Sequence, residues 1–121
     1  MTTPTLLCIS SYFKGNRFLR SAKRLGARVY LLTVESLRSA AWERESLDDL
    51  FVMPELTNLT EVIKGVAYLW RDRPLTHIVA LDDYDVELGA ALREHFRLGG
   101  VGQTAVRHFR DKLAMRYQAR E

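Results

Sequence analysis

Four stretches of the chain are continuously apolar instead of alternating between apolar and polar residues. They cover residues 5–10, 28–34, 50–53 and 78–81. A strand without alternation is buried on both faces, which is typical of a parallel sheet covered by helices on each side. The third stretch is the shortest, because Pro54 ends it. The sequence therefore predicts a small parallel sheet.

Segments with helical spacing separate these strands. They cover residues 15–25, 59–73 and 83–96, and a short helix is expected over 36–42. Gly26 is a stop signal for the first, and Pro74 breaks the second. Asn58 followed by Glu61 predicts a capped start for the second. Right-handed crossovers between parallel strands then predict a three-layer α/β/α, Rossmann-like domain with strand order 3-2-1-4.

The length of 121 residues favours one domain, which we place at residues 1–102. Residues 103–121 follow a different pattern. An apolar stripe at helical spacing runs through Val106, Phe109, Leu113 and Tyr117, with no Gly, Asn or Pro after it. We expect this segment to be a helix that leads into a further domain.

The charges are unevenly distributed along the chain. Residues 1–34 carry six basic side chains and no acid, whereas residues 35–61 carry seven acids. The basic side chains of the first predicted helix lie opposite its apolar ones; the two sets are Arg17, Arg20 and Arg24 against Phe18, Ala22 and Leu25. This pattern favours a solvated face, and nucleic-acid binding by the helix is the alternative.

The sequence also bears on location. It has no apolar stretch near the ~20 residues of a membrane span, and residues 1–4 lack the features of a secretory leader. The single Cys8 lies in an apolar run and is interpreted as a small buried hydrophobe. A cytoplasmic protein without a membrane partner is expected.

Ligands of open α/β sheets bind beyond the carboxyl ends of the strands, where the strand order reverses. In the predicted order this position lies between the first and fourth strands. The residues that follow these strands are Ser10, Ser11, Tyr12, Asp82 and Asp83, with Lys14, Gly15, Tyr84 and Asp85 close by. We interpret the first five as substrate-binding residues; hydroxyls hold anions, and carboxylates bind amines. A serine turn and helix capping by the acids are the alternatives.

Several signatures of catalysis are missing. The turn over residues 10–15 is not G-x-G-x-x-G, and the glycine-rich stretch 99–104 follows a helix, so it is interpreted as a connector. Glu35 is expected to be a surface acid. The three histidines lack the spacing of metal ligands, and there is no nucleophile elbow. No catalytic residue, metal ligand or cofactor is therefore predicted within this chain.

Three stretches of the sequence carry a resemblance to a known family. Residues 78–87, which include Asp82-Asp83-Tyr84-Asp85, are followed by Ala91-Leu92-Arg93 and then by residues 109–116, which include Asp111-Lys112. Together they resemble the ATP-grasp superfamily, in particular its biotin-carboxylase-like and carbamoyl-phosphate-synthase-like members. In that family a Rossmann-like domain precedes the ATP-grasp fold. The resemblance is close over roughly the last 45 residues, and elsewhere it rests on the fold pattern.

The resemblance implies a function. The chain would be the N-terminal substrate-side domain of a carboxylate-amine (or carboxylate-thiol) ligase that acts through an acyl phosphate, and it would be inactive alone. Lys112 would approach ATP, and ATP and Mg²⁺ would belong to the full-length protein. The implied partners are a C-terminal ATP-grasp domain and a small carboxylate or amine, with a homodimer as an option and no nucleic acid. The alternative is a stand-alone doubly wound regulatory or binding module without catalysis.

Overall fold

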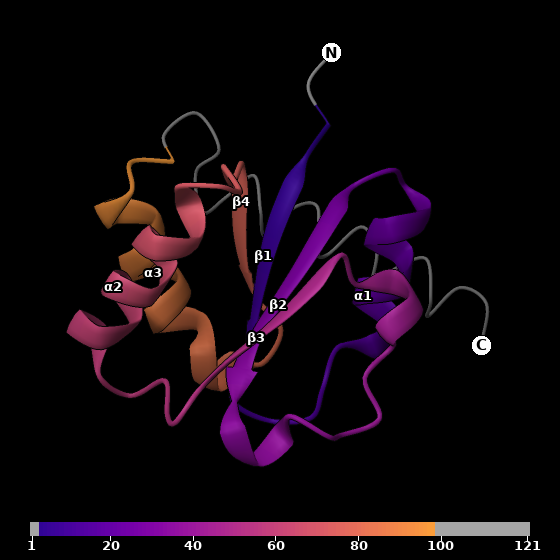
Figure 1. The fold of residues 1–121 in the computed structure, drawn as a ribbon, viewed down its shortest axis with the longest axis horizontal. Coiled ribbons are helices and arrows are strands. Elements are labelled where there is room, and N and C mark those ends of the chain that lie inside the picture. The colour runs from indigo at the N-terminus through magenta and orange to yellow at the C-terminus, as the bar shows by residue number, and fades with distance from the viewer. Residues whose placement is uncertain (1–2, 99–121) are drawn as a thin grey trace.

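The computed structural model describes residues 3–98 (Figure 1). The strands and helices alternate along the chain as β1 (Thr5–Ser10), α1 (Asn16–Arg24), β2 (Arg28–Val34), β3 (Asp49–Met53), α2 (Leu59–Trp70), β4 (His77–Ala80) and α3 (Val86–His95). Three short 3₁₀ helices cover Glu35–Leu37, Arg44–Ser46 and Asp83–Asp85. Residues 103–121, where a further helix was predicted, lie outside the described residues.

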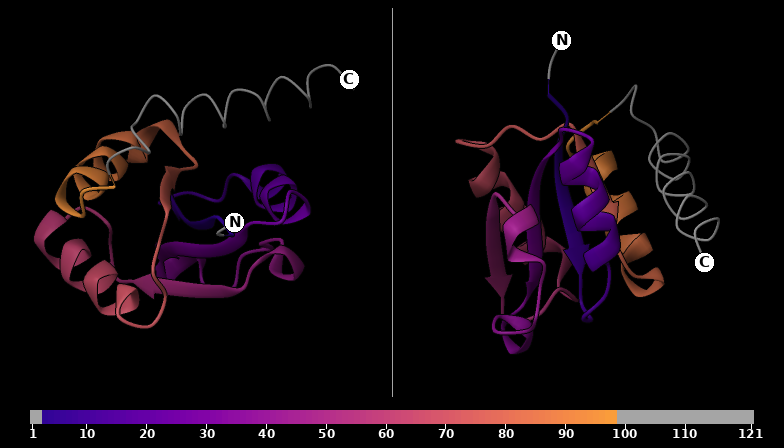
Figure 2. Two further views of the ribbon diagram at one scale, coloured as in Figure 1. Left: turned by 90° about the horizontal axis from the view of Figure 1, so that it is seen from above. Right: turned by 90° about the vertical axis from the view of Figure 1, so that its right-hand side faces the viewer.

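The four strands form one parallel sheet in the order β3-β2-β1-β4, which confirms the predicted topology. Figure 2 shows α1 on one side of this sheet and α2 with α3 on the other. The architecture is therefore the predicted α/β/α sandwich. The strand order reverses between β1 and β4, as expected for half of a doubly wound sheet.

Strand β1 lies at the centre of both cores, and all six of its residues are buried. Leu6 and Cys8 belong to the core under α1, whereas Leu7 and Ile9 belong to the core under α2 and α3. Because successive side chains of a strand point to opposite faces, a strand covered on both sides has no solvent-exposed position. Each fully buried leucine or isoleucine contributes about 1.5–3 kcal/mol.

The predicted helix signals have the expected geometry. Asn58 caps α2, since its Oδ1 accepts the N–H of Glu61 at 3.2 Å. Gly26 follows α1 with a φ of 91°, in the left-handed region that suits a helix end. Two details differ from the prediction. Helix α2 ends at Trp70, three residues before the predicted end. Leu25 is 51% exposed, although it was placed on the apolar face of α1. Ala22 is buried as expected, and Leu19 and Ser21 are the other buried residues of α1.

The segment between β2 and β3 corrects one prediction. A helix was expected over residues 36–42, but the chain forms only the turn Glu35–Leu37 before it becomes irregular. Trp42 is buried against the core under α1, and its Nε1 donates to the carbonyl of Leu37 at 2.9 Å. The burial of Trp42 therefore favours this irregular conformation over the expected helix. Glu35 is exposed and forms a bidentate pair with Arg38, as expected of a surface acid.

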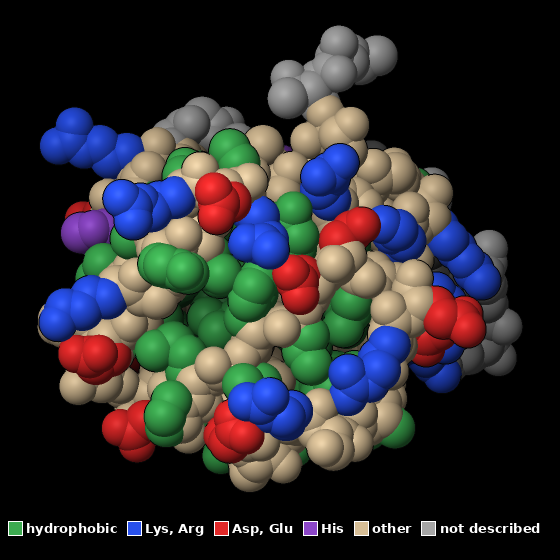
Figure 3. Space-filling model, in the orientation of Figure 1, with side chains coloured by type: hydrophobic (Ala, Val, Ile, Leu, Met, Phe, Trp, Pro, Cys, Tyr) green, Lys and Arg blue, Asp and Glu red, His purple; other side chains and the backbone are tan. Residues whose placement is uncertain are grey.

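The basic side chains of α1 meet the acids that follow β2. Arg20 pairs with Glu43 at 2.8 Å, and Lys23 pairs with Asp48 at 2.8 Å. Figure 3 shows basic and acidic side chains interspersed on the face it presents. The uneven charge of the sequence is thus partly matched within the fold. None of the helices in the described part of the chain is long and apolar enough to cross a membrane.

Strand β4 forms one edge of the sheet. Leu81 donates its N–H to the carbonyl of Ile9, and because alternate residues of a strand face opposite sides, Ile78 turns its carbonyl away from β1. Nη1 of Arg93 donates to this carbonyl at 2.7 Å. Gly89 lies beside the guanidinium, where a Cβ would come within 3.3 Å of Nη1. Burial lowers the pKa of Arg93. Its side chain covers the carbonyl of Ile78, which would otherwise be open at the edge of the sheet.

Candidate functional site

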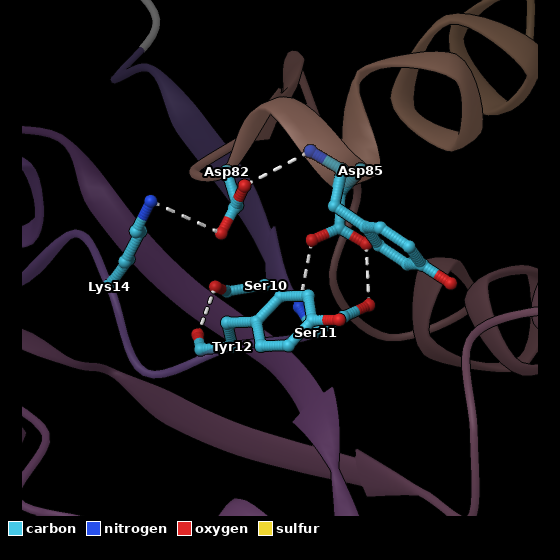
Figure 4. A network of polar contacts seen from close by, with 7 residues as sticks. Ser10, Ser11, Tyr12, Lys14, Asp82 and Asp85 are labelled. Atoms are coloured by element: carbon cyan, nitrogen blue, oxygen red, sulfur yellow. Dashed lines mark hydrogen bonds and ion pairs between the residues drawn. The ribbon is translucent and has the colours of Figure 1, made fainter.

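The loops after β1 and β4 lie side by side at the carboxyl edge of the sheet, where the strand order reverses (Figure 4). The structure places the five predicted substrate-binding residues on these two loops. They are Ser10, Ser11, Tyr12, Asp82 and Asp83. No observation tests whether they bind a substrate, so that role stays a prediction. Their contacts define what each of them can offer.

Asp85 joins the two loops. Its Oδ2 accepts the N–H of Ser11 at 2.8 Å, and its Oδ1 accepts the hydroxyl of Ser11 at 2.6 Å. Asp85 is only 1% exposed, so these donors satisfy a carboxylate that is withdrawn from solvent. The hydroxyl hydrogen of Ser11 is therefore committed to Asp85, and its oxygen keeps lone pairs that can accept from a ligand.

Ser10 has a structural role. Its side chain is fully buried, and its hydroxyl donates to the carbonyl of Tyr12. The N–H of Lys14 also donates to this carbonyl, at 2.9 Å. The carbonyl of Ser10 accepts the hydroxyl of Thr33 at 2.7 Å. Ser10 thus shapes the loop, as in the serine turn that was the alternative interpretation, and its side chain offers no exposed surface to a ligand.

Asp82 combines a cap with an ion pair. Its Oδ1 accepts the N–H of Tyr84 at 3.0 Å, and its Oδ2 lies 3.6 Å from Nζ of Lys14. The Asp82 side chain is 12% exposed, whereas that of Lys14 is 65% exposed. The carboxylate is therefore held at the site while its cation remains largely in solvent. Asp83 is exposed on the adjoining turn.

Tyr12 and Tyr84 meet above these polar groups. Their ring centroids are 5.4 Å apart at an interplanar angle of 89°, an edge-to-face pair that links the two loops. Both rings remain more than half exposed. They give the site an apolar surface that is available for contact with a ligand or another domain.

Gly15 sets the distance between the β1 loop and β4. Its φ is 100°, in the left-handed region, and a Cβ at this position would lie 2.7 Å from Cδ1 of Leu81. Leu81 thus fills the space beside the glycine. The turn before α1 brings the backbone close to a side chain of this protein, and the same space is not open to a phosphate.

These features decide how far the described residues fit ATP and Mg²⁺. The turn beside Gly15 is occupied by Leu81, and the nearby carboxylates of Asp82 and Asp85 would repel phosphate oxygens. Within residues 3–98, no group of three or more His, Cys, Asp or Glu side chains is arranged to hold a metal ion. The described part of the chain therefore does not fit the nucleotide phosphates or their metal. Lys112, the predicted nucleotide contact, lies outside it.

A shallow groove adjoins the site between the first turns of α2 and α3. It has a volume of about 500 Å³, and Tyr84 and Asp85 contribute to its lining. The sequence pattern indicated the acids after β4. It did not predict the pairing of Asp85 with Ser11 or this groove. Both depend on contacts between residues far apart in the sequence, for which single-sequence patterns carry no signal.

Comparisons with known proteins bear on the fold. No protein-family model matches the chain, and no curated protein matches its sequence. Among solved structures, an L-amino acid ligase from Bacillus licheniformis superposes with a TM-score of 0.70 at 15% identity. The match covers 84% of this chain and 25% of the ligase chain. At this identity the likeness establishes a shared fold, and this chain spans about a quarter of the length of the ligase.

Proposed function

We propose that this chain is the N-terminal substrate-side domain of an ATP-dependent carboxylate-amine or carboxylate-thiol ligase of the ATP-grasp type. The observation that carries the proposal is the fold that it shares with part of an L-amino acid ligase. The ATP-grasp-like motifs around Asp82 and Asp111-Lys112 support it independently of that comparison. In this proposal residues 1–102 form the domain, and residues 103–121 lead into a following ATP-grasp domain of the same polypeptide.

The site residues would form one wall of the acceptor site. The oxygen of Ser11 can accept an N–H from a ligand, because its own hydrogen is donated to Asp85. Asp82 can attract an amine, which would take the place of the ammonium group of Lys14 beside its carboxylate. Tyr12 and Asp83 would add an apolar and an acidic contact. These residues bind and orient; none is proposed to react.

ATP and Mg²⁺ belong to the following domain in this proposal, because the described residues do not fit them. The chemistry that ATP supplies there is activation of a carboxylate as an acyl phosphate, which an amine or thiol then attacks. Lys112 is the residue of this chain that we propose for nucleotide contact. The chain alone is expected not to turn over ATP.

The test begins with the gene. If the coding sequence continues beyond Glu121 by some 200 residues or more, its full product can be assayed for phosphate release from ATP. Release that requires both a carboxylate and an amine or thiol would support the proposal. A stop codon after Glu121, or a downstream region without any ATP-dependent ligation, would favour the stand-alone binding module instead.

Lys112 can be tested in the same full-length protein. Lys112→Ala is expected to leave the unfolding temperature unchanged and to weaken ATP binding, because the proposed role of Lys112 is in nucleotide contact and not in folding. Lys64→Ala is a matched control, since Lys64 is an exposed lysine on α2. Equal ATP affinity in both variants would remove Lys112 from the site without contradicting the ligase proposal.

A further inference from the structure

The groove between α2 and α3 has the size of a small-molecule site. Its volume of about 500 Å³ lies within the range of about 300–1,000 Å³ that is usual for such sites. The loop before α2 and its first residue form one wall, and the first turns of α3 form the other. The groove is next to the candidate acceptor site, but five of its lining residues, Leu56, Leu59, Glu87, Leu88 and Ala91, are not part of that site.

Aliphatic side chains line both walls of the groove. The side chains concerned are Leu56, Leu59, Leu88 and Ala91. Leu59, the first residue of α2, is 42% exposed. An aliphatic ligand in the groove would remove this surface from water, at about 25 cal/mol for each Å² covered.

The charged side chains in the groove are all acidic. Asp85 and Glu87 line it, and no Lys, Arg or His does so among the described residues. Asp85 receives only the neutral donors of Ser11, and Glu87 forms no ion pair within residues 3–98. The nearby Lys14 is paired with Asp82. The negative charge that the groove presents to solvent therefore comes from the exposed carboxylate of Glu87, since Asp85 is only 1% exposed.

We propose that this groove binds a small molecule with an aliphatic body and a primary ammonium group. The ammonium would pair with the exposed carboxylate of Glu87, and the aliphatic body would lie against the apolar side chains. Carboxylates of the same shape would be excluded by charge. The inference stands apart from the proposed ligase function, because it concerns binding by the described domain and requires neither ATP nor another domain.

The test uses the full 121-residue chain and three probes of equal shape: isoamylamine, isoamyl alcohol and isovalerate. Amide NMR spectra would be followed during titration at neutral pH. Isoamylamine is expected to shift the signals of residues 56–59 and 84–91 with a Kd of order 1–10 mM. The alcohol should bind about two- to fivefold more weakly, which is the effect of one partly exposed charge pair, and isovalerate should not bind.

Two variants with matched controls locate the binding. Glu87→Gln should weaken isoamylamine binding by about two- to fivefold, whereas Glu94→Gln, on an exposed acid of the same helix, should not. Ala91→Phe should fill the groove and abolish binding, whereas Ala67→Phe on the exposed face of α2 should not. Well-dispersed spectra of each variant establish that it is folded.

Three results would overturn the inference: no shifts at about 20 mM amine, equal affinity for amine and alcohol, or shifts that lie outside the groove. Tighter binding of a lysine-rich peptide than of isoamylamine would also overturn it, because the groove would then serve a protein partner. Any of these results would leave the ligase proposal intact, since that proposal depends on ATP-dependent ligation by the full-length protein.

Discussion

The carboxylate of Asp85 holds Ser11 at two points, through its backbone N–H at 2.8 Å and its hydroxyl at 2.6 Å. The two residues are 74 positions apart in the sequence. Their contact ties the loop after β1 to the start of α3 and fixes the crevice at the carboxyl edge of the sheet. The candidate site is thus preorganised by a buried acid that no substrate needs to touch.

Loss of this acid should destabilise the fold. Asp85→Ala removes the acceptor of both bonds and leaves the partly buried N–H of Ser11 without a partner, so we expect a loss of about 2–3 kcal/mol. Ser11→Ala removes only the hydroxyl bond and should cost about 1 kcal/mol. Urea unfolding measures both. Glu94→Ala, at an exposed acid of the same helix, should stay within about 0.5 kcal/mol of the parent, and an equal loss there would contradict the role of Asp85.

The two glycines with positive φ should respond differently to alanine. Gly15→Ala adds a methyl group 2.7 Å from Cδ1 of Leu81, whereas a Cβ at Gly26 has no atom within 4 Å. Both changes strain the backbone by about 1–2 kcal/mol, and overlap should add about 1–3 kcal/mol at Gly15 alone. Thermal or urea unfolding compares them. In a Leu81→Ala background the difference between the two glycine substitutions should shrink; an unchanged difference would mean that Leu81 is not its cause.

Asp48 should make stability depend on pH. Burial alone would raise its pKa, but hydrogen bonds from Lys23 and from the N–H of Val29, with the charges of Lys23 and Arg28, hold the pKa below its ordinary value of 3.8. A lowered folded-state pKa stabilises the protein above the unfolded value, and this contribution is lost as the pH falls through the folded pKa. Urea midpoints measured from pH 6 downward should therefore fall less steeply below about pH 4 in Asp48→Asn than in the parent. Identical slopes would exclude Asp48 as a source of acid sensitivity.

Cys8 should be inert in the folded protein. It is fully buried in the central strand, and burial strongly raises the pKa of its thiol, so the reactive thiolate is scarce at neutral pH. Ellman's reagent is expected to titrate no thiol in native buffer and one thiol per chain in denaturant. Rapid modification without denaturant would show that the strand opens to solvent or that the thiol is not buried.

The predicted fold follows from local patterns. Unbroken apolar runs identified all four strands, because side chains on both faces of a covered sheet are buried and are therefore mostly apolar. The strand order followed from the handedness of the crossovers. The cap at Asn58 and the helix stop at Gly26 are likewise set by neighbouring residues. Such features require no knowledge of distant contacts.

The features that were mispredicted or missed depend on distant partners. Residues 36–42 have helical spacing, but the burial of Trp42 under α1 overrides that local preference. The uneven charge of the chain did not reveal that Lys23 would meet Asp48. The substrate-binding role of Ser10 stays a prediction; its buried hydroxyl donates to the carbonyl of Tyr12, two residues away. The predicted roles of Asp82 and Asp83 stay predictions, and that of Lys112 is tested by Lys112→Ala in the full-length protein.

The guanidinium of Arg93 on Ile78 also affects how copies of the protein can meet. An exposed strand edge is a template onto which another chain can add, and such addition is a common route to aggregation. An added strand at β4 would have to displace Arg93 from the carbonyl of Ile78. At the opposite edge, on β3, the N–H of Leu50 already donates to Oδ1 of Asp49 at 2.9 Å. On each edge strand, a side chain of the protein thus already bonds to a backbone group that an added strand would need. Self-association of this domain should therefore proceed through its helices and loops. Concentrated solutions should resist fibril growth.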